Sequence, residues 1–195
     1  MKIKPYLIKE LRERTGAGVV SIKEALEESA GDEKKAIEIL RKKGEKIVLK
    51  KQERETRQGL VVSYVHANNK VASLVALACE TDFVARNKEF TDLAHDLALQ
   101  VVATSPLYLE PSEVPPEIVE KEKEIMAAQL KKEGKPEKIW DNIITGKLNK
   151  FYEEVCLLKQ PFIKDDKKTI ETLLKEKIAL LGENIKIKKF VSLNL

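Results

Sequence analysis

The chain has 195 residues, of which 43% are apolar and 35% are charged. This apolar fraction excludes a disordered protein, and the length suits one or two domains with a sizeable buried core. The net charge of +4 is small for a nucleic-acid-binding protein, which usually presents a dense basic face. No apolar run approaches the roughly 18 residues of a membrane-spanning helix, and the N-terminus lacks the apolar segment of a signal peptide. We therefore expect a cytoplasmic protein with no membrane contact and no direct contact with nucleic acid.

Residues 1–44 have the pattern of three short helices joined by tight turns. The first helix has apolar residues at helical spacing and Pro5 in its first turn, and Gly16 and Gly18 end it because glycine accepts the backbone of a helix terminus. A unit of this size has a very small core. We therefore expect it to serve as a docking module.

The boundaries of the next two helices follow from capping residues. Ser21 and Glu24 have the spacing of a capping box, which predicts that the second helix opens there. Gly31 ends the second helix, Asp32 caps the third, and Gly44 ends the third. Residues 45–57 are dense in charge around a brief apolar core, and they predict a helical linker.

The hydrophobic period then changes from helical to strand-like. Residues 59–66 and 71–79 are rich in Val, Tyr and Leu, and the Asn68–Asn69 pair between them tolerates turn backbone. These features predict a β-hairpin. The second strand is nearly all apolar, so we expect it to be central in its sheet and covered by helices.

The remaining chain predicts more helices and one last strand. A helix begins near Phe90, ends at Pro106 and leads into a proline-rich connection. We expect three further helices, at 116–133, 136–161 and 167–182. We expect a last strand with alternating apolar residues at 184–193. The predicted fold class is α+β, with a three-helix domain (1–44), a linker (45–57) and a core with a three-stranded antiparallel sheet (58–195).

The sequence offers no residues for catalysis. It contains none of the common nucleophile, phosphate-loop or zinc-protease motifs, and His66 and His95 are its only histidines. Neither Cys79 nor Cys156 lies in a CxxC pair, so we expect two buried thiols rather than metal ligands. We expect no enzymatic activity, no metal and no cofactor.

One connection is a candidate binding site instead. If Asn87 caps the Phe90 helix, Thr81 to Val84 lie between a strand and a helix N-terminus, with Asp82 beside Phe83. Two interpretations are open. Either Phe83 folds back as a local hydrophobic plug while Asp82 caps a turn, or Phe83 projects as a wedge into a partner's pocket.

Four segments resemble the bacterial elongation factor Ts family. They are LRERTGAGVVSIKEAL (11–26), CETDFVARN (79–87), LLKQPFIKDD (157–166) and EKIALLGENIKIKKF (176–190). Their order and spacing agree with the family over the whole chain, whose length resembles the family's short form.

The chain departs from the family pattern at a few positions. Ile22 stands where a cysteine is usual, and Val19 and Val20 replace a frequent pair of methionines. Ala76 and Ala78 stand where glutamate and asparagine are common. These departures affect local contacts of the two signature regions.

The resemblance implies a guanine-nucleotide exchange factor that binds elongation factor Tu, both GDP-bound and nucleotide-free, and that performs no covalent chemistry. It implies a ubiquitin-associated-like N-terminal domain that docks on the GTPase through residues of the first signature region: Leu11, Arg12, Thr15, Gly16, Ala17, Gly18, Val19 and Val20. It implies that Thr81, Asp82, Phe83 and Val84 enter the partner beside its magnesium site. A noncovalent homodimer through the core is a further expectation. The alternative, an adaptor without exchange activity, leaves Asp82 and Phe83 without a role.

Overall fold

The computed structural model describes residues 4–15 and 17–195. These residues divide between two compact units, which are described separately below. Unit 1 comprises the residues up to Val61 together with Ala76–Ala94 and Thr172–Lys188, and unit 2 comprises Val62–Val75, His95–Glu171 and Lys189–Leu195.

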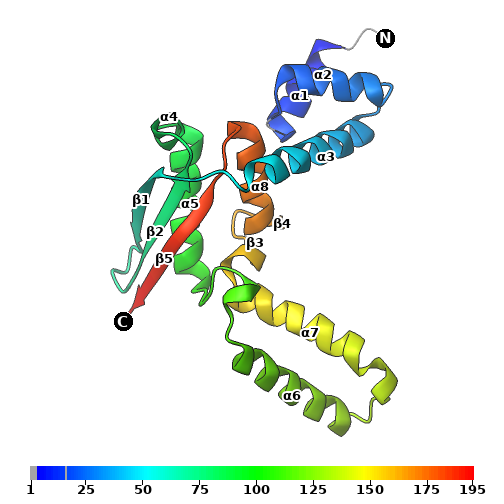
Figure 1. Cartoon of the computed structure of the whole chain (residues 1–195), viewed down its shortest axis with the longest axis vertical. Helices are drawn as coiled ribbons and strands as arrows, with labels where there is room; N and C mark the ends of the chain where they lie inside the picture. Colours follow the sequence, from blue (N-terminus) through cyan, green and yellow to red (C-terminus); the bar gives the residue numbers. More distant parts are fainter. Residues whose placement is uncertain (1–3, 16) are drawn as a thin grey trace. The chain divides into compact units, whose positions relative to one another are not determined.

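The described residues form an α+β fold (Figure 1). The α-helices are α1 (Pro5–Thr15), α2 (Val19–Glu28), α3 (Glu33–Lys51), α4 (Asp82–Ala85), α5 (Lys88–Thr104), α6 (Pro116–Lys132), α7 (Trp140–Val155) and α8 (Ile170–Leu181). The strands are β1 (Gln58–Val65), β2 (Val71–Cys79), β3 (Pro161–Phe162), β4 (Asp165–Thr169) and β5 (Lys186–Asn194). Three short 3-10 helices cover Pro111–Glu113, Glu137–Ile139 and Leu157–Lys159.

Helix α2 begins earlier than the sequence predicted. Gly18 is its N-cap, with φ −65° and ψ 148°, and the backbone N–H of Ile22 donates to Gly18 O at 3.0 Å. Ser21 is therefore inside the first turn, and the predicted capping box is wrong because the helix starts two residues before it. The predicted end is confirmed, since Gly31 has φ 85° and its N–H donates to Leu26 O at 2.8 Å.

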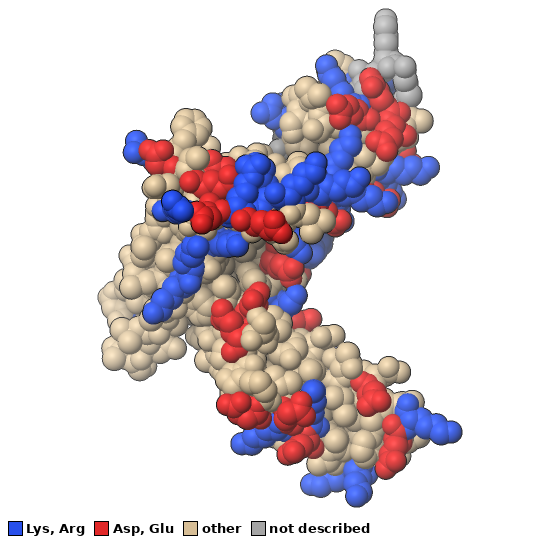
Figure 2. All heavy atoms as spheres, viewed as in Figure 1, with Lys and Arg blue, Asp and Glu red and all other residues tan. Residues whose placement is uncertain are grey.

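Helix α3 begins as predicted and ends later. Asp32 caps it by accepting a hydrogen bond from Lys35 N at 3.1 Å. The helix then passes through Gly44 to Lys51, so the predicted stop at Gly44 is wrong. Glycine costs a helix interior only about 1 kcal/mol, and Val48, one turn further on, is 4% exposed. The segment expected to be a helical linker is helical as far as Lys51, and Figure 2 shows Lys and Arg side chains gathered over α3.

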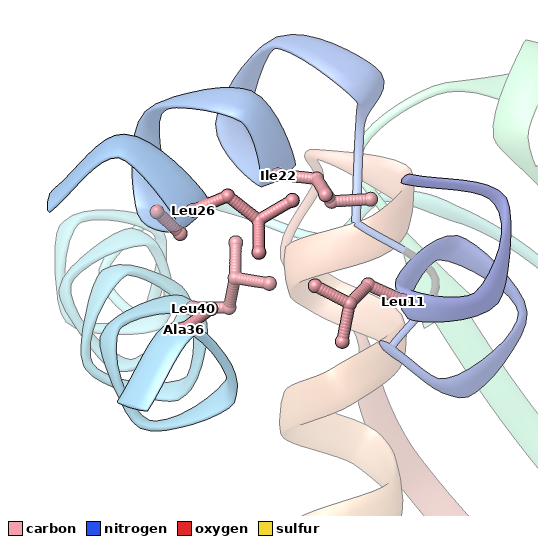
Figure 3. Packing of buried hydrophobic residues seen from close by; sticks show 6 residues of the cluster. Leu11, Ile22, Leu26, Ala36 and Leu40 are labelled. Carbon is pink, nitrogen blue, oxygen red and sulfur yellow. The ribbon is translucent and has the colours of Figure 1, made fainter. Parts of the chain in front are cut away.

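The helices α1, α2 and α3 pack around a small apolar core in unit 1 (Figure 3). Leu11 from α1 and Ile22 from α2 are fully buried, and Leu40 from α3 completes their contacts. Apolar residues spaced three or four apart place one face of each helix toward this core. The three predicted helices are confirmed.

The sheet has the strand order β1-β2-β5 and is antiparallel, with β2 central as predicted. The turn between β1 and β2 has Asn69 at φ 56°, and the N–H of His66 donates to Val71 O at 2.9 Å. Gly59 in β1 lies so close to β2 that a Cβ there would be 2.1 Å from Leu77 O. The backbone approach therefore requires glycine at this position.

Unit 2 contains the antiparallel helix pair α6 and α7 (Figure 1) and a small hairpin, β3–β4, that the sequence did not predict. The sequence favoured continuous helix up to Pro161, whereas α7 ends at Val155. Gln100 of α5 is fully buried, and its side chain accepts from Ile163 N at 2.9 Å and donates to Pro161 O at 3.1 Å. These long-range hydrogen bonds satisfy the backbone of the hairpin in a way that no local pattern indicates.

Candidate partner-binding site

The Thr81–Val84 turn follows the end of β2 and forms the start of α4. Thr81 has extended backbone, φ −124° and ψ 157°, and its hydroxyl oxygen accepts a hydrogen bond from Val84 N at 3.4 Å. This is the N-cap arrangement, in which a threonine satisfies one free amide of a helix start. The sequence predicted a connection here, and the structure adds one helical turn to it.

Phe83 and Val84 face opposite environments. The Phe83 side chain is 80% exposed, whereas Val84 is 6% exposed. Consecutive residues of a helix point about 100° apart, so Val84 can face the protein while Phe83 faces solvent. The plug interpretation of Phe83 is therefore wrong, because Val84 occupies the buried position.

Asp82 forms an exposed ion pair within the same turn. Its Oδ2 lies 3.1 Å from Arg86 Nη2, at the i, i+4 spacing of a helix. Both side chains are largely exposed, so the pair contributes little to stability and either partner is free to exchange for a group on another molecule. The i, i+4 spacing of an acid and an arginine is the sequence signal for this contact.

A polar cluster of Arg54, Glu80, Thr81, Glu183 and Asn184 supports the base of the turn. Glu183 Oε2 accepts from the N–H of Glu80 at 3.1 Å and of Thr81 at 3.0 Å, and Glu183 Oε1 accepts from the Thr81 hydroxyl at 2.6 Å. Glu80 in turn accepts from Asn184 N at 2.7 Å and from Arg54 Nη1 at 3.2 Å. Sequence reasoning missed this cluster, because its members come from three distant segments.

Two groups near the turn have shifted pKa values. Partial burial of Glu80 disfavours its charge, but the Asn184 N–H and the Arg54 guanidinium outweigh this and lower the pKa of Glu80. Burial, reinforced by the charge of Glu183, raises the pKa of the Cys79 thiol to about 11. Cys79 therefore stays protonated and donates to Thr81 O at 3.1 Å. Cys79 and Cys156 are both buried and unpaired, as predicted.

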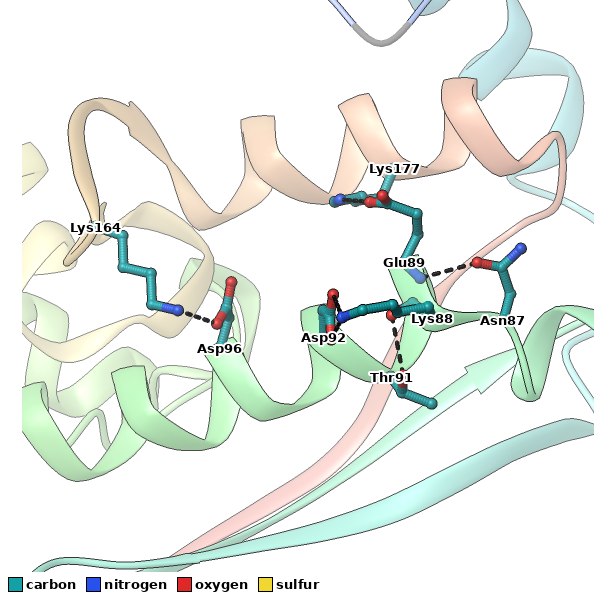
Figure 4. Close-up of polar contacts among 8 residues, drawn as sticks. All are labelled: Asn87, Lys88, Glu89, Thr91, Asp92, Asp96, Lys164 and Lys177. Atoms are coloured by element: carbon teal, nitrogen blue, oxygen red, sulfur yellow. Dashed lines mark hydrogen bonds and ion pairs between the residues drawn. The ribbon is translucent and has the colours of Figure 1, made fainter. Parts of the chain in front are cut away.

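Helix α5 begins at Lys88, shortly after the turn in the sequence, and Figure 4 shows polar contacts near its N-terminus. Asn87 Oδ1 accepts from Glu89 N at 2.8 Å, which confirms Asn87 as the residue that caps this helix. Lys88 Nζ donates to Asp92 at 2.7 Å, and this contact raises the pKa of Lys88. Glu89 also pairs with Lys177 of α8. The helix that follows the turn is thus fixed at its N-terminus.

The residues assigned to N-terminal docking fall into two groups. One group lies on the surface: Val20 is 70% exposed, Val19 is 38% exposed, and Arg12 and Gly18 are exposed. Ala17 is half-buried beside them. Val19 and Val20 begin α2, Ala17 and Gly18 precede it, and Arg12 lies in α1.

The other group is internal to the bundle. Leu11 is fully buried, so its side chain supports the surface from within and does not belong to the contact surface itself. Thr15 is half-buried; its hydroxyl donates to Leu11 O at 2.6 Å and accepts from Ala17 N at 3.3 Å. Gly16 lies outside the described residues.

Over residues 4–15 and 17–195, no group of three or more His, Cys, Asp or Glu side chains is placed to hold a metal ion. Within the same residues, no helix has the length and apolar character needed to cross a membrane.

The fold and the site together define an α+β protein whose candidate site is an exposed turn with a hydrogen-bonded base. The sequence model of the family described as "Elongation factor TS" matches residues 7–195. The chain is 53% identical over 189 residues to elongation factor Ts of Thermosipho melanesiensis, covering 97% of this chain and 96% of the relative. It is 52% identical over 195 residues to the protein of that name from Maridesulfovibrio salexigens, covering 100% and 95%. The chain belongs to the elongation factor Ts family.

Proposed function

We propose that this protein is a guanine-nucleotide exchange factor that binds elongation factor Tu and accelerates the release of GDP. The observation that supports this most strongly is Phe83, which is 80% exposed at the tip of a capped helical turn. A large exposed aromatic side chain on a fixed backbone suits insertion into a pocket of a partner, where such residues contribute most of the binding energy.

The proposed mechanism requires binding and no bond chemistry in this chain. A GTPase holds the phosphates of its nucleotide through backbone amides, a lysine and Mg²⁺. Insertion of Asp82 and Phe83 beside that magnesium site displaces these groups and weakens the nucleotide's contacts. By linkage, a factor that binds the nucleotide-free form more tightly lowers nucleotide affinity by the same ratio, and a thousandfold ratio corresponds to about 4 kcal/mol.

A second contact in this proposal is the N-terminal docking surface formed by Arg12, Gly18, Val19 and Val20. Val20 is 70% exposed, so an apolar contact with the GTPase is available to it without unfolding. In this scheme residues 1–44 form a docking domain of ubiquitin-associated-like type, residues 45–57 a linker, and residues 58–195 the core. Docking supplies affinity, and the Thr81–Val84 turn supplies exchange. We propose that this nucleotide exchange takes place in the cytoplasm.

A noncovalent homodimer through the core is part of the same proposal. In unit 2, the exposed side chains of Val65, Leu74, Val191 and Leu193 make an apolar sheet surface, each between 46% and 68% exposed. Figure 2 shows that the surface over the β1–β2 hairpin contains few charged side chains. An apolar sheet face of this kind is suited to pairing with a second copy. Sedimentation velocity across a range of concentrations tests this, and a monomer at all of them contradicts it.

The exchange proposal is tested by the release of a fluorescent GDP analogue from elongation factor Tu. The intact protein is compared with Asp82→Ala and Phe83→Ala, and with Leu107→Ala as a matched control, because Leu107 is an apolar side chain 70% exposed in unit 2. We expect strong acceleration by the intact protein and by the control, and a large loss in Phe83→Ala. Equal rates for the intact protein and Phe83→Ala contradict the role of the turn, and binding without acceleration favours an adaptor.

A further inference from the structure

The direction of the Phe83 side chain is set by its backbone alone. Phe83 is 80% exposed and so has few contacts of its own. Helix α4 has only four residues, far fewer than a helix needs to be stable in isolation. Whatever fixes the start of α4 therefore fixes the position of Phe83.

Glu183 fixes that start through three hydrogen bonds on one carboxylate. Two come from the consecutive backbone N–H groups of Glu80 and Thr81, and the third comes from the Thr81 hydroxyl. Hydrogen bonds to an ionised carboxylate are shorter and stronger than neutral ones. Since the hydroxyl proton of Thr81 is directed to Glu183, the lone pairs of the same oxygen remain available to Val84 N, which caps α4.

Glu183 lies in a short connection whose neighbouring residues are hydrogen-bonded on both sides. Gly182, with φ 72°, ends α8 by donating its N–H to Ile178 O at 2.9 Å. On the other side, Asn184 is 1% exposed and its side chain donates to Arg54 O at 2.7 Å and to Gln52 O at 3.2 Å. The backbone N–H of Asn184 also donates to Glu80. The carboxylate is therefore presented to the turn from a segment anchored at both ends.

We infer that Glu183 is a positioning residue of the exchange reaction: it holds Thr81, and through the cap of α4 it holds Phe83 in the orientation that enters the partner. This inference rests on the proposed exchange function of the turn. It goes beyond that function by assigning a role to a residue outside the turn, 102 positions away from Thr81 in the sequence.

The test uses Glu183→Ala and Glu183→Gln in the full chain, with Glu153→Ala, an exposed glutamate of α7 in unit 2, as the matched control. Release of the fluorescent GDP analogue is measured over a range of exchange-factor concentrations to separate the maximal rate from the half-saturating concentration. In Glu183→Ala we expect the maximal rate to fall roughly tenfold or more, the effect of losing charge-assisted hydrogen bonds. The half-saturating concentration changes by about threefold at most, because the docking surface is intact. Glu183→Gln keeps an oxygen acceptor and retains part of the rate.

The double variant Glu183→Ala/Phe83→Ala distinguishes a positioning role of Glu183 from a merely structural one. If Glu183 acts through Phe83, the maximal rate of Glu183→Ala/Phe83→Ala equals that of Phe83→Ala alone. If the two losses multiply, or if Glu183→Ala keeps the full maximal rate while Phe83→Ala loses it, the inference is wrong. Should Glu183→Ala fail to melt cooperatively, Thr81→Val takes its place. This variant removes the hydroxyl contacts with Glu183 and with Val84 N but keeps the two backbone contacts of Glu183, and it is expected to show a smaller loss of the same kind.

Amide hydrogen exchange in the free protein separates this inference from the proposed function. We expect the amides of Glu80, Thr81 and Val84 to exchange faster in Glu183→Ala and to keep their protection in Glu153→Ala. Unchanged protection at these amides overturns the inference, whatever the activity. If the intact protein does not accelerate GDP release at all, the proposed function fails, and the inference that depends on it falls with it.

Discussion

Glu80 Oε1 accepts a hydrogen bond from the backbone N–H of Asn184 at 2.7 Å, and this contact joins the residue after β2 to the connection that precedes β5. The same carboxylate pairs with Arg54 at 3.2 Å. The Glu80 side chain is 17% exposed, so the ionised form is favoured by its partners in a place where solvent screens it only in part.

This contact predicts acid sensitivity. The folded state lowers the pKa of Glu80 below its ordinary value of 4.5, so its stabilisation is complete above pH 4.5 and is lost as the pH falls through the lowered value. We expect Glu80→Gln to be less stable than the wild type at pH 7, and this difference to shrink as the pH falls from 4.5. Urea unfolding at several pH values measures it, with Glu153→Gln as the control. A difference that stays constant down to low pH contradicts the assignment.

Neighbouring substitutions in α4 should have opposite consequences for stability. Val84 is buried, so Val84→Ala is expected to lower the free energy of unfolding by about 1–3 kcal/mol. Phe83→Ala is expected to change it by less than about 0.5 kcal/mol, because the side chain is exposed. Thermal or urea unfolding measures both. A destabilisation by Phe83→Ala that matches that of Val84→Ala would show that Phe83 packs in solution.

Two glycine substitutions, one in β1 and one in α7 as a control, test the close approach of β1 and β2. In Gly59→Ala the new Cβ would lie 2.1 Å from Leu77 O at φ +149°, so we expect a loss of at least about 2 kcal/mol. Gly146→Ala in α7 meets nothing within 4 Å and is expected to stabilise by about 1 kcal/mol, since alanine is the better helix former. Urea unfolding of both variants gives the comparison. Equal effects would mean that the strands are further apart than described.

The two cysteines should be unreactive in the folded protein. Burial raises the pKa of Cys79 and of Cys156 to about 11, and the thiolate is the reactive species. We expect iodoacetamide at pH 8 to label neither residue unless a denaturant is present, and treated protein to keep its exchange activity. Mass spectrometry measures the labelling. Rapid modification of Cys79 under native conditions would contradict its buried environment.

The proposed division of labour predicts the effect of a truncation. Deletion of residues 1–50 removes α1, α2 and nearly all of α3, so we expect weaker binding to elongation factor Tu. The remaining chain is expected to melt cooperatively, because the sheet and its helices are kept. Calorimetry and a binding titration measure the two properties. Loss of cooperative melting would mean that the three helices and the core do not fold independently.

Much of the fold was predictable because its patterns are local. The β1–β2 hairpin has two strands rich in Val, Tyr and Leu on either side of Asn69, and the caps at Asp32 and Asn87 lie next to the helices that they start. The errors came from local signals that other contacts outweighed: Gly44 looks like a helix end, but burial of Val48 keeps α3 intact. Gln100 hydrogen-bonds to the backbone of the hairpin β3–β4, and the two segments are too far apart in the sequence for a local pattern to predict this contact.

The candidate site was predictable in part for the same reason. The sequence placed Asp82 and Phe83 on a strand-to-helix connection, but periodicity alone left the direction of the Phe83 side chain open. In the structure Val84 takes the buried position and Phe83 is exposed. The support from Glu183 was not predictable, since a glutamate that follows a glycine has no distinguishing sequence pattern. Such contacts become visible only when the fold brings distant segments together.

The most direct test of the central claim is the rate at which elongation factor Tu releases a fluorescent GDP analogue as the intact protein is titrated. The account predicts an acceleration that rises with concentration, saturates, and is lost in Phe83→Ala but kept in Leu107→Ala. A release rate that stays at its spontaneous value at every concentration would contradict the account.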